Sequence, residues 1–128
     1  MIVSSAAGRR GIPYFGAYSA TKAAQLSLAE ALRVELAADR IAVTSVHPVG
    51  TKTDFFTTAE VVSESRMPIR HGVEVQQTAG TVARKIVGGI ERPRAEVWPY
   101  RVARVALSVA TLVPGLVDRA LAGRKPKG

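Results

Sequence analysis

The sequence predicts an α/β fold in which a parallel sheet is covered by helices. Three short runs have the β-branched or apolar character of buried strands, and they lie at 1–5, 40–48 and 95–99. Stretches with a helical spacing of apolar residues follow these runs, at 17–38, 75–93 and 101–122. This alternation of strands and helices is typical of a parallel sheet with helical crossover connections.

The longest predicted helix covers 17–38. This stretch is rich in Ala, Leu, Glu, Lys and Arg and contains neither Gly nor Pro, which gives it a high helix propensity. Its apolar residues fall on one predicted face, which comprises Ala20, Ala24, Leu28, Ala31 and Leu32. The pattern is that of an amphipathic helix.

The other segments complete a single domain, because 128 residues are too few for two. A second apolar face is predicted within 75–93 and comprises Val75, Ala79, Val82, Ala83, Ile86 and Ile90. Two short helices are predicted at 101–112 and 115–122, with a break at Pro114. Residues 49–74 show no sustained period, so we expect a long functional loop with room for a short helix.

Composition excludes several classes of site. The chain has no cysteine, which rules out disulfides and thiolate metal ligands, and His47 and His71 share no metal-ligand spacing, so no metal site is expected. His47 is interpreted as the end of a strand ahead of a proline. The start of the chain lacks the basic and apolar pattern of a signal peptide, and we expect a cytoplasmic protein.

Positive charge is concentrated in the C-terminal region. From Arg92 onward eight basic residues face Glu96 and Asp118, which accounts for +6 of the net charge of +8. No aromatic residues interleave the final charges, so a solvated basic end is favoured and nucleic-acid binding is not expected. The apolar run 105–117 is shorter than the roughly twenty residues of a membrane-spanning helix. Peripheral contact with an anionic membrane through 105–122 stays open.

The stretch VSSAAGRRGIPYFGAYSATKAA, residues 3–24, carries the candidate chemistry. Tyr18 and Lys22 are four residues apart near the start of the long predicted helix, so their side chains share a face. A nearby ammonium stabilises a phenolate, which makes a tyrosine a better acid or base. Ser5, at the end of the first predicted strand, could hydrogen-bond the same reacting oxygen, since ligands of open α/β sheets bind at that edge. A serine that caps a turn and a solvated helix lysine are the alternative interpretations.

In this spacing the sequence resembles the classical short-chain dehydrogenase/reductase (SDR) family. The active-site pattern of that family is a serine, twelve residues, a tyrosine, three residues and a lysine, and it is matched by Ser5, Tyr18 and Lys22. Tyr14 does not fit this pattern, because the residue four positions after it is Tyr18 and not a lysine. A second landmark is HPVGTKTDFF, 47–56. The family carries Pro-Gly here with a threonine five residues after the proline, and this chain has Pro48 and Thr53 but Val49 in place of the glycine.

The resemblance implies the C-terminal half of a Rossmann-like doubly wound parallel sheet, with about three strands and their flanking helices. It implies a small-molecule carbonyl or alcohol substrate, a substrate loop at 54–74, C-terminal helices and a basic tail at 101–128, and a homo-oligomer for the full-length parent. It further implies an NAD or NADP cofactor that supplies the hydride. Tyr18 would be the general acid or base and Ser5 would orient the substrate oxygen. The cofactor-binding residues would be Tyr18, Lys22, Pro48, Thr51 and Thr53.

Two parts of the family pattern are absent from the sequence. No glycine-rich turn of the kind that binds the dinucleotide pyrophosphate is present, because Gly8 and Gly11 do not form that pattern, and the chain contains no asparagine for the active-site position of the family. We therefore expect either a fragment of a complete reductase or a short product that has lost cofactor binding, inactive alone in both cases. The alternative is a non-enzymatic interaction or oligomerisation module derived from the family.

Overall fold

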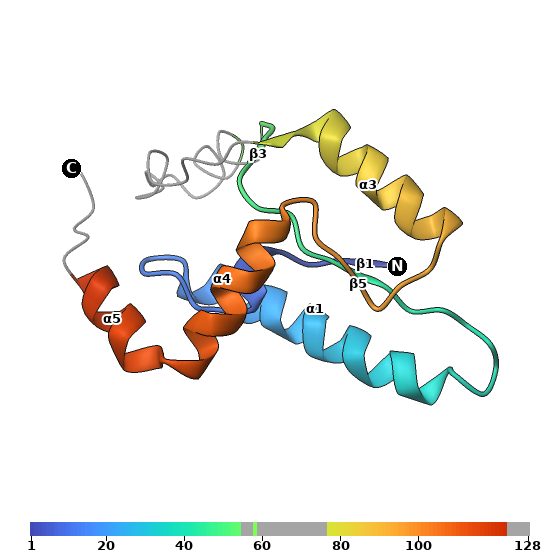
Figure 1. The fold of residues 1–128 in the computed structure, drawn as a ribbon, viewed down its shortest axis with the longest axis horizontal. Helices are drawn as coiled ribbons and strands as arrows, with labels where there is room; N and C mark the ends of the chain where they lie inside the picture. The colour runs from blue at the N-terminus through green and yellow to red at the C-terminus, as the bar shows by residue number, and fades with distance from the viewer. Residues whose placement is uncertain (55–57, 59–76, 123–128) are drawn as a thin grey trace.

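The computed structural model describes residues 1–54, 58 and 77–122 (Figure 1). Most of the predicted substrate loop at 54–74 and the end of the basic tail, 123–128, lie outside the described residues. Strands and helices alternate along the described residues, except that three short strands follow one another between the two longest helices.

Three parallel strands form the central sheet. They are β1 (Ile2–Val3), β2 (Ser45–Val46) and β5 (Glu96–Val97), in the order β1-β2-β5. Ile2 is paired with Ser45, and Ser45 with Glu96. The prediction of a three-stranded parallel sheet is confirmed, although each strand is shorter than its predicted run.

A second sheet was not predicted. The strands β3 (Thr51–Lys52) and β4 (Gln77–Thr78) pair in parallel, with Thr51 opposite Gln77, and Gln77 donates a backbone hydrogen bond to the Gly50 carbonyl at 2.8 Å. The expectation of a loop throughout 49–74 is therefore wrong at Thr51–Lys52. A two-residue strand is too short to show the period-two alternation by which strands are recognised.

Helices lie on both sides of the central strands (Figure 1). The 3-10 helix η1 (Ala6–Gly8) follows β1 directly, and α1 (Gly16–Glu35) packs on η1, β1 and β2. On the other side, α3 (Ala79–Glu91) packs on β5 and β3. The sheet is thereby covered on both faces.

The buried face of α1 differs from the predicted one. Ser19, Leu26 and Ala29 are buried, whereas Ala20, Ala24 and Ala31 are exposed and Leu28 is 54% exposed. The helix is rotated so that the side bearing Lys22 approaches η1, where Ser4 Oγ donates a hydrogen bond to the Lys22 carbonyl at 2.7 Å. Alanines add little to an apolar stripe, so this polar contact and the packing around it decide which side is buried.

Helix α3 begins at a capped N-terminus and packs closely on β5. The Thr78 hydroxyl accepts a hydrogen bond from the Thr81 amide at 3.2 Å, which satisfies one of the free donors at the helix start. Of the predicted apolar face, Val82 is buried and Ile86 is half-buried, but Ile90 is 62% exposed. Gly89 takes the inward position instead.

The two C-terminal helices are α4 (Arg101–Leu112) and α5 (Pro114–Ala122). Pro114 is the first residue of α5, a position that suits its fixed φ and missing amide hydrogen, and so the break falls at Val113. No single helix among the described residues is long and apolar enough to cross a membrane. Taken together, α4 and α5 pass that test of length and composition, but they are bent by 106°.

Candidate active site

Ser5 occupies the turn that leaves the carboxyl end of β1. Its backbone is extended, and its hydroxyl oxygen accepts a hydrogen bond from the Ala7 amide at 3.2 Å, so Ser5 is the N-cap of η1. The Ala6 amide then donates to the Pro48 carbonyl at 3.0 Å, which joins this turn to the chain that leaves β2. Ser5 and Pro48 therefore lie at the same edge of the sheet.

Tyr18 and Lys22 lie in the first two turns of α1 and are half-buried. The Lys22 ammonium is 5.7 Å from the centroid of the Tyr18 ring. It also donates to the Val3 carbonyl at 3.4 Å, two residues before Ser5, and to Gln25 Oε1 at 3.1 Å. The lysine thus links the strand end that precedes Ser5 to the helix that carries Tyr18.

Thr51 and Thr53 lie further along the chain from Pro48. Thr51 is in β3, where its hydroxyl donates to the Val49 carbonyl at 3.0 Å, and Thr53 is exposed just after that strand. Thr51 thus belongs to the second sheet, whereas Ser5 follows β1 of the central sheet and Lys22 reaches the Val3 carbonyl of that strand.

His47 is fully buried. As the sequence predicts, it lies at the end of a strand, directly ahead of Pro48. It follows β2 directly and stacks on Trp98, with ring centroids 4.4 Å apart and planes 11° apart. Its Nε2 lies 3.0 Å from Ser45 Oγ, while Nδ1 has no hydrogen-bond partner among the described residues. Burial lowers the pKa of His47 and outweighs the opposing attraction of the Glu96 carboxylate. The imidazole is therefore neutral near pH 7.

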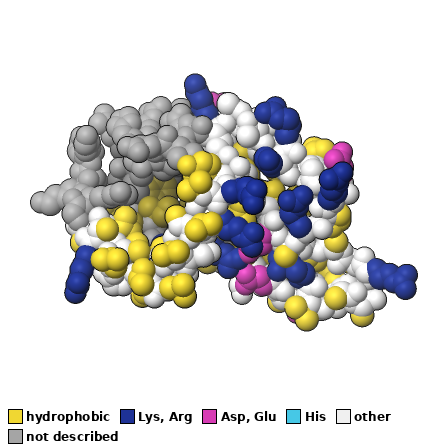
Figure 2. Space-filling model, viewed as in Figure 1, with side chains coloured by type: hydrophobic (Ala, Val, Ile, Leu, Met, Phe, Trp, Pro, Cys, Tyr) yellow, Lys and Arg dark blue, Asp and Glu magenta, His cyan; other side chains and the backbone are white. Residues whose placement is uncertain are grey.

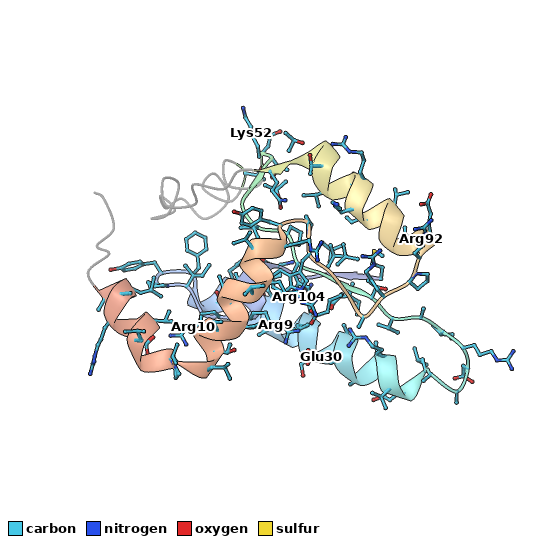
Figure 3. All side chains as sticks on the ribbon, in the orientation of Figure 1. Arg9, Arg10, Glu30, Lys52, Arg92 and Arg104 are labelled. Carbon is cyan, nitrogen blue, oxygen red and sulfur yellow. The ribbon has the colours of Figure 1, made fainter. Side chains whose placement is uncertain are left out.

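A cluster of charged residues, which no local sequence pattern predicts, joins the loop after Ser5 to three other elements. Arg9 forms ion pairs with Glu96 of β5 and, at 3.2 Å, with Glu30 of α1 (Figure 3). Arg104 of α4 lies 3.6 Å from Glu96, and Trp98 Nε1 donates to Glu96 at 2.9 Å. Burial would raise the pKa of Glu96, but the indole hydrogen bond and the Arg9 charge outweigh it and lower that pKa. The cluster thus fixes the loop 6–10 against α1 and β5.

A cavity of about 540 Å³ lies between η1, β5 and α4, on the side of the charged cluster. Its walls include Gly8, Arg9, Leu26, Glu96, Trp98 and Arg104. None of Ser5, Tyr18 and Lys22 lines it, so the cavity is not the space in front of the Tyr18 hydroxyl. No group of three or more metal-ligating side chains occurs within the described ranges.

Comparisons with known proteins show what this chain is similar to. Residues 1–62 match the family described as short chain dehydrogenase. "Dehydrogenase/reductase SDR family member 7B" of Mus musculus is 30% identical over 127 residues, which are 98% of this chain and 39% of that protein. The chain is thus similar in sequence to proteins of the short-chain dehydrogenase/reductase family.

Two solved structures share the fold. A short-chain dehydrogenase from Sphingobium yanoikuyae in complex with NADPH has a TM-score of 0.65 and 22% identity, over 98% of this chain and 46% of that one. A short chain dehydrogenase from Mycobacterium paratuberculosis bound to NAD has a TM-score of 0.53 and 24% identity, over 75% of this chain and 41% of that one. The chain thus spans less than half the length of each of these relatives. At these identities the likeness establishes an α/β fold with parallel strands.

Proposed function

We propose that this chain carries the catalytic part of an NAD(P)-dependent oxidoreductase that reduces a carbonyl or oxidises an alcohol. The observation that carries the proposal is the position of Lys22, whose ammonium lies 5.7 Å from the Tyr18 ring and hydrogen-bonds the strand end before Ser5. A phenol, an ammonium and a hydroxyl at the carboxyl end of parallel strands form a suitable set for proton transfer to a carbonyl oxygen.

Each residue has one proposed task. Tyr18 donates a proton to the carbonyl oxygen in reduction and accepts one from the alcohol in oxidation. Lys22 stabilises the phenolate form of Tyr18 and hydrogen-bonds the nicotinamide ribose. Ser5 Oγ accepts from the Ala7 amide, so its own hydroxyl proton can be donated to the substrate oxygen and hold that oxygen in place.

The donor set at this edge fits a nicotinamide cofactor. An ammonium and hydroxyls can bind the ribose hydroxyls and the carboxamide, and the proposed contacts are Tyr18, Lys22, Pro48, Thr51 and Thr53. When bound, the cofactor supplies the hydride, which no side chain of this chain can provide.

The chain is further proposed to correspond to the C-terminal half of the family's domain. It spans 39% of its mouse relative, and its sequence holds no glycine-rich turn for a pyrophosphate. In that case the 128 residues alone bind NADPH poorly. Isothermal titration calorimetry of NADPH into the 128-residue chain tests this, and a dissociation constant in the micromolar range would contradict it.

A cytoplasmic homo-oligomer is the proposed state of the longer parent. Leu28 is 54% exposed on α1, and an apolar residue on an exposed helix side suits packing against a second copy. Sedimentation velocity of the parent and of its Leu28→Glu variant measures the association directly.

The catalytic assignment is tested in a protein of the relatives' length that contains these residues. Tyr18→Phe removes the transferable proton, and the turnover number should fall by about 10²–10⁴. Tyr14→Phe is the matched control, because Tyr14 lies four residues earlier and is 58% exposed. Equal turnover in the two variants would remove Tyr18 from the mechanism and leave the alternative of an interaction module.

A further inference from the structure

Helices α4 and α5 carry an exposed apolar stripe. Its residues recur at helical spacing along α4 and continue onto α5, and their exposed fractions are Val102 62%, Val105 65%, Val109 53%, Leu112 81% and Leu116 67%. In Figure 2 hydrophobic side chains gather over these two helices. A surface helix ordinarily exposes its polar side to solvent. An exposed apolar stripe of this kind is therefore typical of an interaction surface.

Most of the stripe lies apart from the side on which α4 packs, and only Leu112 at its end also borders the cavity. Ala103, Leu107 and Ala110 are the half-buried residues of α4, and Leu107 faces the cavity together with Arg104. Among the described residues, α4 packs mainly on η1 and α5, and Arg104 reaches Glu96 of β5. The side of α4 that bears Val105 and Val109 is therefore exposed and is not used in packing against the described residues.

Positive charge borders this stripe. Arg101 and Arg119 are exposed at the two ends of the helix pair, and the sequence continues with Arg124, Lys125 and Lys127. Both acidic residues of the region are already neutralised. Asp118 forms an ion pair with Arg10, and Glu96 forms ion pairs with Arg9 and Arg104. The surface therefore combines apolar area with uncompensated positive charge.

The geometry favours lying on a bilayer over crossing one. Helices of 12 and 9 residues are about 18 and 14 Å long, whereas the hydrocarbon core is about 30 Å thick. The 106° bend prevents the two from acting as one span. Two short amphipathic helices joined at a bend can instead bury their apolar faces at the headgroup boundary, with basic residues next to lipid phosphates.

We propose that the α4–α5 surface, formed by Val102, Val105, Val109, Leu112 and Leu116 with Arg101 and Arg119, docks on an anionic membrane surface. The apolar residues enter the headgroup boundary and the arginines contact the phosphates of anionic lipids. This inference is independent of the proposed catalytic function, since it uses none of the residues at the end of β1.

Because the chain has no cysteine, a single introduced cysteine can report on the contact. Val109→Cys carries an environment-sensitive fluorophore and is mixed with vesicles of phosphatidylcholine alone or with 30 mol% phosphatidylserine. Val34→Cys, on the exposed part of α1, is the matched control. We expect a blue-shifted emission for Val109→Cys with the anionic vesicles and no shift for Val34→Cys. A shift at both positions, or at neither, would overturn the proposal.

The charge requirement is tested with Arg101→Glu combined with Arg119→Glu. Both positions are exposed, so we expect the fold, followed by circular dichroism, to persist and the partition coefficient into anionic vesicles to fall more than tenfold. If that double variant does not fold, raising the salt concentration from 0.05 to 0.5 M with the unaltered chain must weaken binding. Salt-independent binding would overturn the proposal. So would a shift at Val109 that follows protein concentration without vesicles, because a second copy would then be the occupant.

Discussion

Gly8 lies so close to the carbonyl of Lys22 that no side chain fits between them. A Cβ atom on Gly8 would be 2.8 Å from the Lys22 oxygen and 3.0 Å from Ser4 Oγ. The atom in the way belongs to the backbone of α1, so it cannot move without shifting the helix. This contact sets the distance between the turn that carries Ser5 and the helix that carries Tyr18.

Gly8→Ala should therefore destabilise the fold by about 1–3 kcal/mol, the usual cost of overpacking a tight contact. Gly11→Ala is the control in the same loop, because a Cβ there meets nothing within 4 Å, and its effect should stay within about 0.5 kcal/mol. Urea denaturation followed by circular dichroism measures both. Equal midpoints for the two variants would mean that η1 and α1 are not held at this distance.

Substitution by alanine should change the stability of the fold in opposite directions at two adjacent glycines of α3, Gly88 and Gly89. A Cβ on Gly89 would lie 2.6 Å from Val97 Cγ2 and 3.3 Å from Met1, inside the contact between α3 and the sheet. A Cβ on Gly88 would meet nothing within 4 Å. Gly89→Ala should cost about 1–3 kcal/mol, and Gly88→Ala should stabilise by about 0.5–1 kcal/mol through its higher helix propensity.

Thermal unfolding of the two variants side by side checks this prediction. Since both substitutions add the same methyl group to the same helix, the difference between their melting temperatures reports the packing of α3 alone. Stabilisation by Gly89→Ala would show that α3 does not rest on β5 at this point.

The sequence was informative where local chemistry decides the structure. Apolar periodicity and proline positions located the three parallel strands and four helices, and the four-residue spacing of Tyr18 and Lys22 predicted a shared side of α1, where the ammonium lies 5.7 Å from the ring. It was uninformative where distant residues meet. Arg9 and Glu96 are 87 positions apart, and nothing near either residue indicates the pairing. The buried side of α1 was also mispredicted, because it depends on the polar contact of Ser4 with Lys22.

Burial of His47 should make the stability of the chain fall in mild acid. The pKa of His47 is lowered in the folded state, whereas in the unfolded chain the imidazole takes up a proton near pH 6.5. The unfolded state thus binds more protons below pH 6.5, and stability falls with pH until the lowered pKa is passed, with a slope of up to about 1.4 kcal/mol per pH unit.

His47→Phe tests this dependence, because phenylalanine can still stack on Trp98 but cannot titrate. Ser45 Oγ keeps its hydrogen bond to the Ala95 carbonyl at 3.3 Å in that variant. Free energies of unfolding at pH 8 and pH 5.5 should differ less for His47→Phe than for the unaltered chain. The same difference in both proteins would exclude His47 as the source.

The last prediction separates the two tasks proposed for Lys22, and it is measured in a protein of the relatives' length that contains these residues. If the ammonium 5.7 Å from the Tyr18 ring stabilises the phenolate, Lys22→Met should move the pH profile of kcat/KM for alcohol oxidation to more alkaline pH. Loss of the proposed ribose hydrogen bond should separately raise the KM for the cofactor. Lys22→Arg keeps the charge but changes its shape, so it should restore the profile better than the KM. An unchanged profile in Lys22→Met would leave Lys22 a structural residue that joins α1 to the Val3 carbonyl.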